Sequence, residues 1–464
     1  MAARPATSAA RTGRAGLAAT AVSIVCTVAV AAAGPSLMEP PLPGAQGQPP
    51  WAFDLGLNPY LAVGLAATGL AAGTLGVALT LRAMRRGWTV SPGYVLMAGA
   101  VAAAVAGTTR PFGSSDFISY AAYGRELVTG HNPYLIAPAA LARLGDPVAR
   151  AVQDWAGTPS VYGALATGVF GIASLAGGTS ARLTVFVLDA VNVAAFIGTG
   201  VLLDRMARGP AGRLRAAVLW TCNPLLLQIL VAGSHVDGLA AAFSIAGIAV
   251  LAPRIPNGRF VTSPPHSALP SGVRPLGGAL PGLAAGLLLG LGFAVKPTVL
   301  LVALGLGFAA WPRNGFRRPL RTTTPASAAS HASAVLGLAA GFAAVAIADV
   351  LLIGRAGITQ TLRGSGMVSV GSPWRVVRTL LSLLVSSSAA DEVVRWCAVA
   401  LAVFLAMRLL RPRAYANLPL APSAYSRQAN CAIGMVRPGA WAAFALVFAW
   451  LLAWPYVLPW YDAL

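Results

Sequence analysis

Long apolar runs separated by short polar segments dominate the sequence. Most of them are long enough for a helix that crosses a bilayer, which needs about 20 residues. The pattern therefore predicts an all-α, polytopic transmembrane protein with about 11–13 membrane segments. The expected spans cover residues 16–33, 57–81, 93–107, 183–203, 216–232, 239–252, 277–294, 298–311, 332–353, 394–410 and 439–454.

Two further apolar segments do not suit a simple crossing. Residues 161–177 are interrupted by three glycines, and a crossing there would send the arginine cluster at 205–215 to the outer side of the membrane. We expect this segment to be re-entrant or interfacial, with both ends outside. Residues 374–389 are too short to span and are expected at the outer interface.

The basic residues set the expected orientation. The formal net charge is +20, but the charges lie in short clusters at the ends of apolar runs, which is typical of cytoplasmic loops and does not indicate nucleic-acid binding. We expect a cytoplasmic tail at 1–15 and a single transmembrane domain at 16–464, with an outer loop at about 108–160 and a cytoplasmic linker at about 253–276. The first apolar run suits either a span or a cleavable signal peptide.

The longest polar interruption in the first half of the chain runs from residue 110 to residue 134. It holds Asp116, with Tyr120 and Tyr123 at the i+4 and i+7 positions of one helix face. A shielded carboxylate beside aromatic rings suits a general base acting on a sugar hydroxyl. The alternative is an interfacial helix with a tyrosine belt and a solvated aspartate.

The predicted topology brings His235 and Asp237, in GSHVDG, to the same outer side. This pair supplies at most two of the three or four ligands that a metal site needs, and Asp237 also suits a helix cap. The sequence has no Walker loop, GxGxxG or HExxH motif. We therefore expect no metal or nucleotide cofactor.

Several cations are also expected on the outer side. Lys296 is the sole lysine and lies at a membrane boundary, where a functional role and snorkelling are both open. Arg363 and Arg375, with Arg355 and Arg378 nearby, suit either an anionic headgroup or phosphate or contact with anionic lipid.

Two features inside predicted spans favour structural interpretations. Asp189, with Asn192 three residues later, is expected to neutralise a neighbouring arginine, and a direct role is the alternative. The closely spaced glycines in GLLLGLGFAV indicate close packing between helices.

Six short motifs then occur in order: HNPY, PSVYGALATG, NPLLL, GSHVDG, KPT and PWY. With the early outer-loop aspartate, they make residues 90–464 resemble the actinobacterial polyprenol-phosphomannose-dependent α-(1→6) mannosyltransferases, which are GT-C class integral membrane glycosyltransferases. The resemblance implies a multi-pass protein of the cell membrane with an extracytoplasmic site. It implies a polyprenyl-phosphate mannose donor and a mannan acceptor of lipomannan and lipoarabinomannan type.

The resemblance also implies roles for particular residues. Asp116 matches the acidic residue of the first outer catalytic loop and would act as the base in an inverting transfer. Lys296 and the outer arginines would stabilise the leaving phosphate. The candidate substrate-binding residues are Tyr120, Tyr123, His235, Asp237, Lys296, Arg363, Arg375, Trp460 and Tyr461.

The implied partners are the lipid-linked donor, the mannan or glycolipid acceptor and membrane lipids, without nucleic acid. Alternatives are transfer of arabinose or another lipid-linked sugar, a glycolipid transporter or flippase, and an inactive scaffold. A transporter would show inverted repeats, and we find no such symmetry in the sequence. Family members usually continue past PWY with further hydrophobic sequence, whereas this chain stops just after it. A C-terminally truncated protein is therefore a further alternative.

Overall fold

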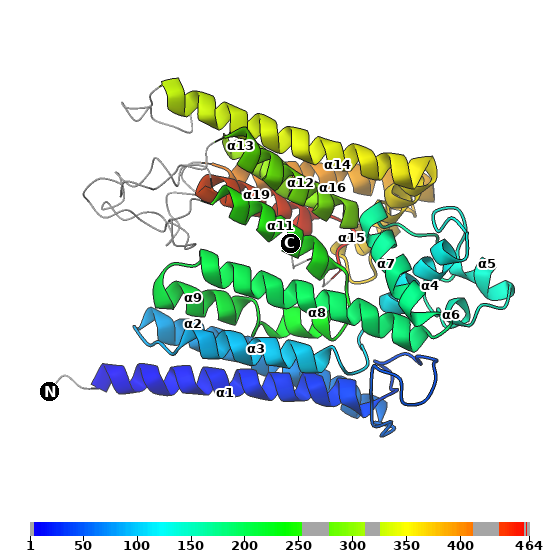
Figure 1. Cartoon of the computed structure of the whole chain (residues 1–464), viewed down its shortest axis with the longest axis horizontal. Helices are drawn as coiled ribbons and strands as arrows, with labels where there is room; N and C mark the ends of the chain where they lie inside the picture. Colours follow the sequence, from blue (N-terminus) through cyan, green and yellow to red (C-terminus); the bar gives the residue numbers. More distant parts are fainter. Residues whose placement is uncertain (1–3, 253–277, 311–324, 412–435, 459–460, 462–464) are drawn as a thin grey trace. The chain divides into compact units, whose positions relative to one another are not determined.

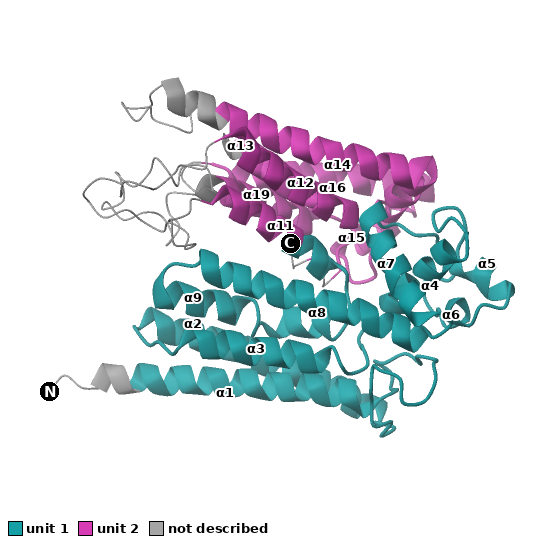
Figure 2. Cartoon of the chain, in the orientation of Figure 1, with its two compact units in different colours: residues 1–242, 463 teal, residues 243–462, 464 magenta. Residues whose placement is uncertain are grey.

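The computed structural model describes residues 4–252, 278–310, 325–411, 436–458 and 461. Every named element in these residues is a helix (Figure 1), so the predicted all-α fold is confirmed. The chain divides into two compact units, residues 1–242 and residues 243–462, which we call the N-terminal and C-terminal units (Figure 2). The predicted linker at 253–276 lies outside the described residues.

The N-terminal unit contains a set of long helices that run side by side and a group of shorter helices gathered at one end of them (Figure 1). The long set consists of α1 (Arg4–Ala33), α2 (Pro59–Arg85), α3 (Pro92–Ala106), α8 (Ala181–Met206) and α9 (Gly209–Leu219). The group at the end consists of α4 (Asp116–Val128), α5 (Pro138–Arg143), α6 (Pro147–Arg150) and α7 (Ala164–Gly177). The polar stretch predicted as an outer loop is therefore largely helical.

Local sequence explains where the long helices begin and end, as α2 illustrates. The Asn58 side chain accepts a hydrogen bond from the Tyr60 amide at 2.9 Å, and Pro59 occupies the first turn. Both features stabilise a helix start. Arg82 and Arg85 lie in the last turn, where their charge complements the helix dipole.

Four described helical segments are long and apolar enough to cross a membrane: residues 8–33, 59–85, 181–206 and 332–365. The fifth candidate is the bent pair of residues 209–219 and 224–231, with an angle of 40° between its parts. Six shorter apolar helices accompany them. The prediction of several membrane-spanning helices is confirmed. The number of 11–13 crossing segments and their orientation remain predictions.

The bend interrupts the span expected at 216–232. Asn223 caps the short helix α10 (Pro224–Leu226) by accepting hydrogen bonds from the Leu225 and Leu226 amides at 3.0 and 3.4 Å. A π-helical turn (Leu227–Val231) follows, and α11 (Asp237–Leu251) comes after it. A cap and a proline in the middle of an apolar run break the helix.

Asp189 in α8 is 1% exposed, but among the described residues no arginine or lysine forms an ion pair with it. The prediction that a neighbouring arginine neutralises it is therefore wrong. Its polar neighbour is Ser234, which follows the π-helical turn. The sequence pattern did not predict that Asp189 and Ser234 lie near each other, because the π-helical turn and the bend before it set where Ser234 lies.

The C-terminal unit is built from helices whose backbones approach closely. Its described elements are α12 (Ala279–Val295), α13 (Val299–Ala310), α14 (Pro325–Ser365), α15 (Pro373–Leu381), α16 (Ser387–Leu409) and α19 (Val436–Ala453). A Cβ atom on Gly286 would lie 2.2 Å from the carbonyl oxygen of Leu338, and one on Gly290 would lie 2.6 Å from the Cβ atom of Val345. The predicted packing role of these glycines is confirmed.

Two boundaries in this unit correspond to features of the sequence pattern. Helix α14 is kinked at Gly354, whose φ of 62° suits glycine, directly after the span predicted at 332–353. Helix α15 has no buried residue and covers the first half of the segment expected at the outer interface. Its position at an interface remains a prediction.

One glycine, Gly124, lets α4 lie close to the backbone of α7. A Cβ atom on Gly124 would lie 2.1 Å from the carbonyl oxygen of Phe170 in α7. A contact this short with backbone cannot be relieved by rotating a side chain, so a larger residue would push α4 and α7 apart.

We predict that Gly124→Ala lowers the free energy of unfolding of the detergent-solubilised protein by about 1–3 kcal/mol. The matched control is Gly168→Ala in α7, where an added Cβ meets no atom within 4 Å. The measurement is the thermal unfolding midpoint of each variant. Equal midpoints for both variants would contradict the close approach of α4 to α7.

Candidate functional site

Asp116 is the first residue of α4. Its backbone amide donates a hydrogen bond to Ser114 Oγ at 3.1 Å, and its side chain is 13% exposed. A carboxylate in the first turn is favoured by the helix dipole. The helix start therefore presents a largely shielded carboxylate that still reaches the surface.

Two side chains from distant segments hold the Asp116 carboxylate. Trp155 Nε1 donates a hydrogen bond to Oδ1 at 3.1 Å. His235 Nε2 lies 3.7 Å from Oδ2, which is an ion-pair distance and is longer than a hydrogen bond. The structure thus brings together Asp116 and His235, two of the residues that the sequence placed on one side.

The tautomer of His235 follows from its other contact. His235 is 2% exposed, and its Nδ1 lies 2.8 Å from the Ile229 carbonyl oxygen. A carbonyl only accepts, so Nδ1 carries the hydrogen. In a neutral ring, Nε2 would then point a lone pair at a carboxylate, which is unfavourable. The Asp116–His235 pair is therefore best satisfied when it holds one additional proton.

The two tyrosines of α4 are buried rather than open to solvent. Tyr120 is 1% exposed, and its ring stacks on Phe170 with centroids 4.9 Å apart. Tyr123 is 2% exposed and donates a hydrogen bond to the Thr158 carbonyl oxygen at 2.9 Å. Both rings pack α4 in place, and contact of either ring with a substrate remains a prediction.

Tyr162 completes the aromatic layer behind Asp116. Its hydroxyl donates a hydrogen bond to the Tyr120 hydroxyl at 3.2 Å. The pKa of Tyr162 is raised well above its ordinary value, first by burial and then by Tyr120 and the negative charges of Asp116 and Asp237. Tyr162 therefore stays a neutral donor, and Asp237, fully buried at the start of α11, belongs to the same surroundings.

Sequence reasoning missed Trp155 and Asp154. Ser115 Oγ donates a hydrogen bond to Asp154 Oδ2 at 2.6 Å, so residues 154 and 155 both attach to the start of α4. Only one signal pointed to them: a tryptophan next to an acidic residue near the end of the polar loop. In the described part of the chain, no group of three or more His, Cys, Asp or Glu residues is arranged to hold a metal ion.

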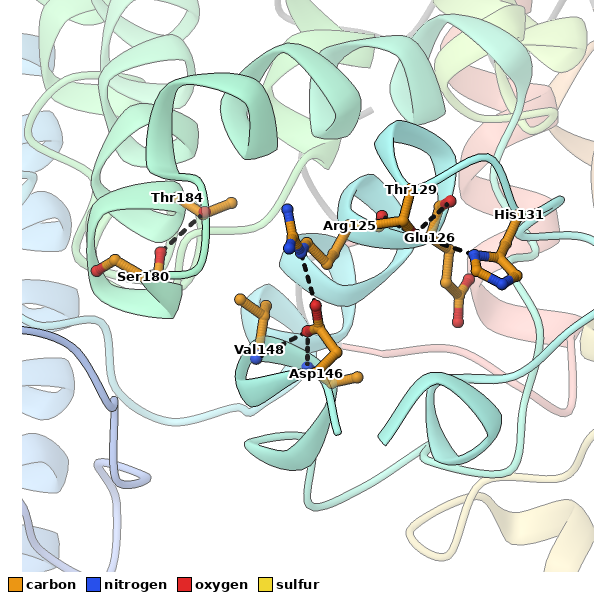
Figure 3. Close-up of polar contacts among 9 residues, drawn as sticks. Arg125, Glu126, Thr129, His131, Asp146, Val148, Ser180 and Thr184 are labelled. Atoms are coloured by element: carbon orange, nitrogen blue, oxygen red, sulfur yellow. Dashed lines mark hydrogen bonds and ion pairs between the residues drawn. The ribbon is translucent and has the colours of Figure 1, made fainter. Parts of the chain in front are cut away.

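A second set of contacts fixes the far side of α4 (Figure 3). Arg125 Nε pairs with Asp146 Oδ2 at 2.6 Å, while Asp146 Oδ1 accepts hydrogen bonds from the Val148 and Ala149 amides. One carboxylate thus caps α6 and ties it to α4. Neutralising Asp146 would weaken both connections.

Glu126 lies at the C-terminal end of α4, near Thr129 and His131 (Figure 3). The Glu126 side chain is fully buried, and neither carboxyl oxygen has a hydrogen-bond partner among the described residues. Burial raises the pKa of Glu126 from 4.5 to about 9. The group is therefore a neutral acid at pH 7.

We predict that Glu126 makes stability fall as pH rises. Its pKa is about 9 when folded and near 4.5 when unfolded, so the folded protein binds more protons between these values. The stability that the protonated Glu126 side chain contributes is fully present below about pH 4.5 and is lost as pH rises through about 9. Each tenfold difference between the folded and unfolded acid constants corresponds to roughly 1.4 kcal/mol of folding free energy. The measurement is the unfolding midpoint across this range.

Glu126→Gln keeps the shape of the side chain and should flatten this dependence. Glu392→Gln, at an exposed position in α16, serves as the control and should leave it unchanged. A slope in Glu126→Gln as steep as in the wild type would show that Glu126 titrates normally.

In the C-terminal unit the structure brings Lys296 to Tyr461. Lys296 caps the C-terminus of α12 and is 8% exposed, with Nζ 3.6 Å from the centroid of the Tyr461 ring. The Tyr461 ring also stacks on Trp450 of α19, with centroids 5.6 Å apart. The lysine is thus held in a buried cation–π contact, which does not fit the snorkelling alternative.

The segment after the kink in α14 packs on the end of α19. Trp374 Nε1 donates a hydrogen bond to the Ala453 carbonyl oxygen at 2.8 Å, and the Ser369 amide donates to that of Pro455 at 3.1 Å. Arg363 and Arg375 are both exposed.

Arg378 is one of the cations that the sequence placed on the outer side, and in the structure it is paired. It forms an ion pair with Asp391 of α16. Trp460 lies outside the described residues, so its predicted role in binding stays a prediction.

Comparison with known proteins gives two findings. Residues 14–313 match the model of the family described as "Alpha-(1->6)-mannopyranosyltransferase, N-terminal domain". A segment of 147 residues is 33% identical to a "Probable alpha-(1->6)-mannopyranosyltransferase" of Mycolicibacterium smegmatis, and it covers 30% of this chain and 25% of that protein. No solved structure matches the chain.

Proposed function

The chain belongs to the alpha-(1→6)-mannopyranosyltransferase family, and we propose that it transfers mannose from polyprenyl-phosphate mannose to the 6-hydroxyl of a growing α-(1→6) mannan. Lipomannan and lipoarabinomannan are the proposed products, and the outer face of the membrane is the proposed place. Family membership supports the linkage. The donor, the product and the membrane face rest on the sequence motifs and the charge pattern.

Asp116 is the proposed general base. In the transfer, the acceptor O6 forms a bond to the anomeric carbon of the donor, and the bond from that carbon to the phosphate oxygen breaks. The O6 proton passes to Asp116, and polyprenyl phosphate leaves with the bonding electrons. A single displacement of this kind inverts a β-linked donor to an α-linked product.

The observation that carries this proposal is the setting of the Asp116 carboxylate. Trp155 Nε1 binds Oδ1 at 3.1 Å and fixes the orientation of the carboxylate, while the second oxygen, Oδ2, faces His235 at 3.7 Å. A fixed and shielded carboxylate that is 13% exposed suits proton abstraction from a hydroxyl at its surface. His235 is a positioning residue that carries the additional proton of the pair, so the Asp116 carboxylate stays ionised and can accept the O6 proton.

The leaving phosphate needs positive charge as the bond to the anomeric carbon breaks. Lys296, Arg363 and Arg375 are the proposed source of that charge. Lys296 is held against Tyr461 in a defined position, whereas the two arginines are exposed. This assignment is independent of the role of Asp116.

We predict that Asp116→Asn lowers the rate of mannose transfer by at least about 10²-fold, because loss of a positioned base typically costs 10²–10⁴-fold. The assay uses membranes supplied with polyprenyl-phosphate mannose and an α-(1→6) mannan acceptor, and linkage analysis of the product establishes the bond formed. The control is Glu392→Gln, which removes an exposed carboxylate of the same charge. Unchanged transfer by Asp116→Asn would remove Asp116 as the base.

A further inference from the structure

The N-terminal unit contains a cavity of about 600 Å³. This volume lies within the range of about 300–1,000 Å³ that is usual for ligand sites. Prolines of the segment after α1, including Pro41 and Pro43, form part of its wall. The polar wall is formed by Asp54, Arg110, Arg150 and Gln153.

A buried arginine, Arg110, lies beside two acidic side chains and supports the polar wall. Arg110 is 5% exposed, and its Nη1 lies 3.2 Å from Asp54 Oδ1 and 3.6 Å from Glu39 Oε1. Burial raises the pKa of Glu39 to about 8, so at neutral pH the charge of Arg110 is matched mainly by Asp54. The Nε atom of Arg110 is buried and has no hydrogen-bond acceptor among the described residues.

Asp54 is thereby fixed while staying accessible. Its side chain is 62% exposed, and the amides on both sides of it, of Phe53 and Leu55, donate hydrogen bonds to carbonyls at the end of α1 at 2.8 and 2.7 Å. Holding a buried arginine in place costs desolvation energy. Here that arginine orients a carboxylate at the cavity wall.

The chemistry of the wall suits a neutral, hydroxyl-rich ligand better than an anion. Asp54 offers fixed acceptor oxygens, while Arg150 and Gln153 offer N–H donors. The proline rings offer apolar surface to the C–H faces of a sugar. An anion would meet the exposed Asp54 carboxylate, and the nearest buried cation is already paired with that carboxylate.

The cavity is also connected to Asp116 through short segments of chain. Gln153 lies two residues before Trp155, so their Cα atoms are at most about 7 Å apart. Trp155 donates its indole hydrogen bond to Asp116. Arg110 precedes Asp116 by six residues, which limits their Cα separation to about 20 Å.

We propose that this cavity binds the acceptor glycan, holding α-(1→6)-linked mannose residues behind the terminal residue whose 6-hydroxyl reaches Asp116. The proposal rests on the proposed function, because it names a second subsite for the same acceptor. It predicts that longer acceptors bind more tightly than a single mannoside, since only longer acceptors reach the cavity.

The first experiment measures acceptor KM at saturating donor for a mannoside and for an α-(1→6) mannotetraose. We expect Gln153→Ala to raise KM for the tetraose about three- to tenfold, as expected for a lost hydrogen bond, with KM for the mannoside and for the donor unchanged. Asp54→Asn should act in the same direction. The control Gln46→Ala, at an exposed position of the segment after α1, should change neither value.

The second experiment measures binding without transfer, by saturation-transfer-difference NMR of α-(1→6) mannotriose with the solubilised full chain carrying Asp116→Asn. Gln153→Ala added to this chain should weaken the signal, and inorganic phosphate should not compete. Equal binding with and without Gln153→Ala, or displacement by phosphate, would overturn the glycan subsite. Mannotriose binding, combined with a wild-type chain that transfers no mannose, would instead count against the proposed function alone.

Discussion

The hydrogen bond from the Trp155 indole to Asp116 is the contact on which the candidate site depends. It joins the start of α4 to a segment nearly forty residues later, and the neighbouring bond from Ser115 to Asp154 strengthens the same connection. His235 approaches the other carboxylate oxygen from the turn before α11. Three segments that are distant in the sequence thereby fix one carboxylate.

The fold around this carboxylate is rigid for identifiable reasons. Gly124 lets α4 lie against the backbone of α7, and Tyr120 stacks on Phe170 across the same interface. On the other side, Arg125 ties α4 to the cap of α6. Close packing on both sides leaves α4 little freedom to rotate, so the direction of its first residue is determined by the scaffold.

The hydrophobic pattern predicted those features of the fold that depend on local sequence. The apolar runs gave the helices, and the glycine spacing near Gly286 gave the close packing of α12 with α14. The hydrophobic pattern did not predict the bend at Asn223 or the position of Asp189 beside Ser234. Both depend on tertiary packing and on the π-helical turn.

For the candidate site, the sequence identified Asp116 and His235 by type and by expected side. It also identified Lys296, whose contact with Tyr461 joins two of the motifs, KPT and PWY. The sequence could not identify Trp155, because the position of a residue in a loop does not predict which distant side chain it will contact. Tyr120 lies in the core, and its contact with a substrate remains a prediction.

The most direct measurement is the structure of the full chain with an unreactive donor analogue and an α-(1→6) mannan oligosaccharide. If Asp116 is the base, the O6 atom of the terminal mannose will lie about 2.6–3.2 Å from an Asp116 carboxylate oxygen. An acceptor bound with its O6 atom beyond the reach of Asp116, and beside another carboxylate, would contradict the central claim.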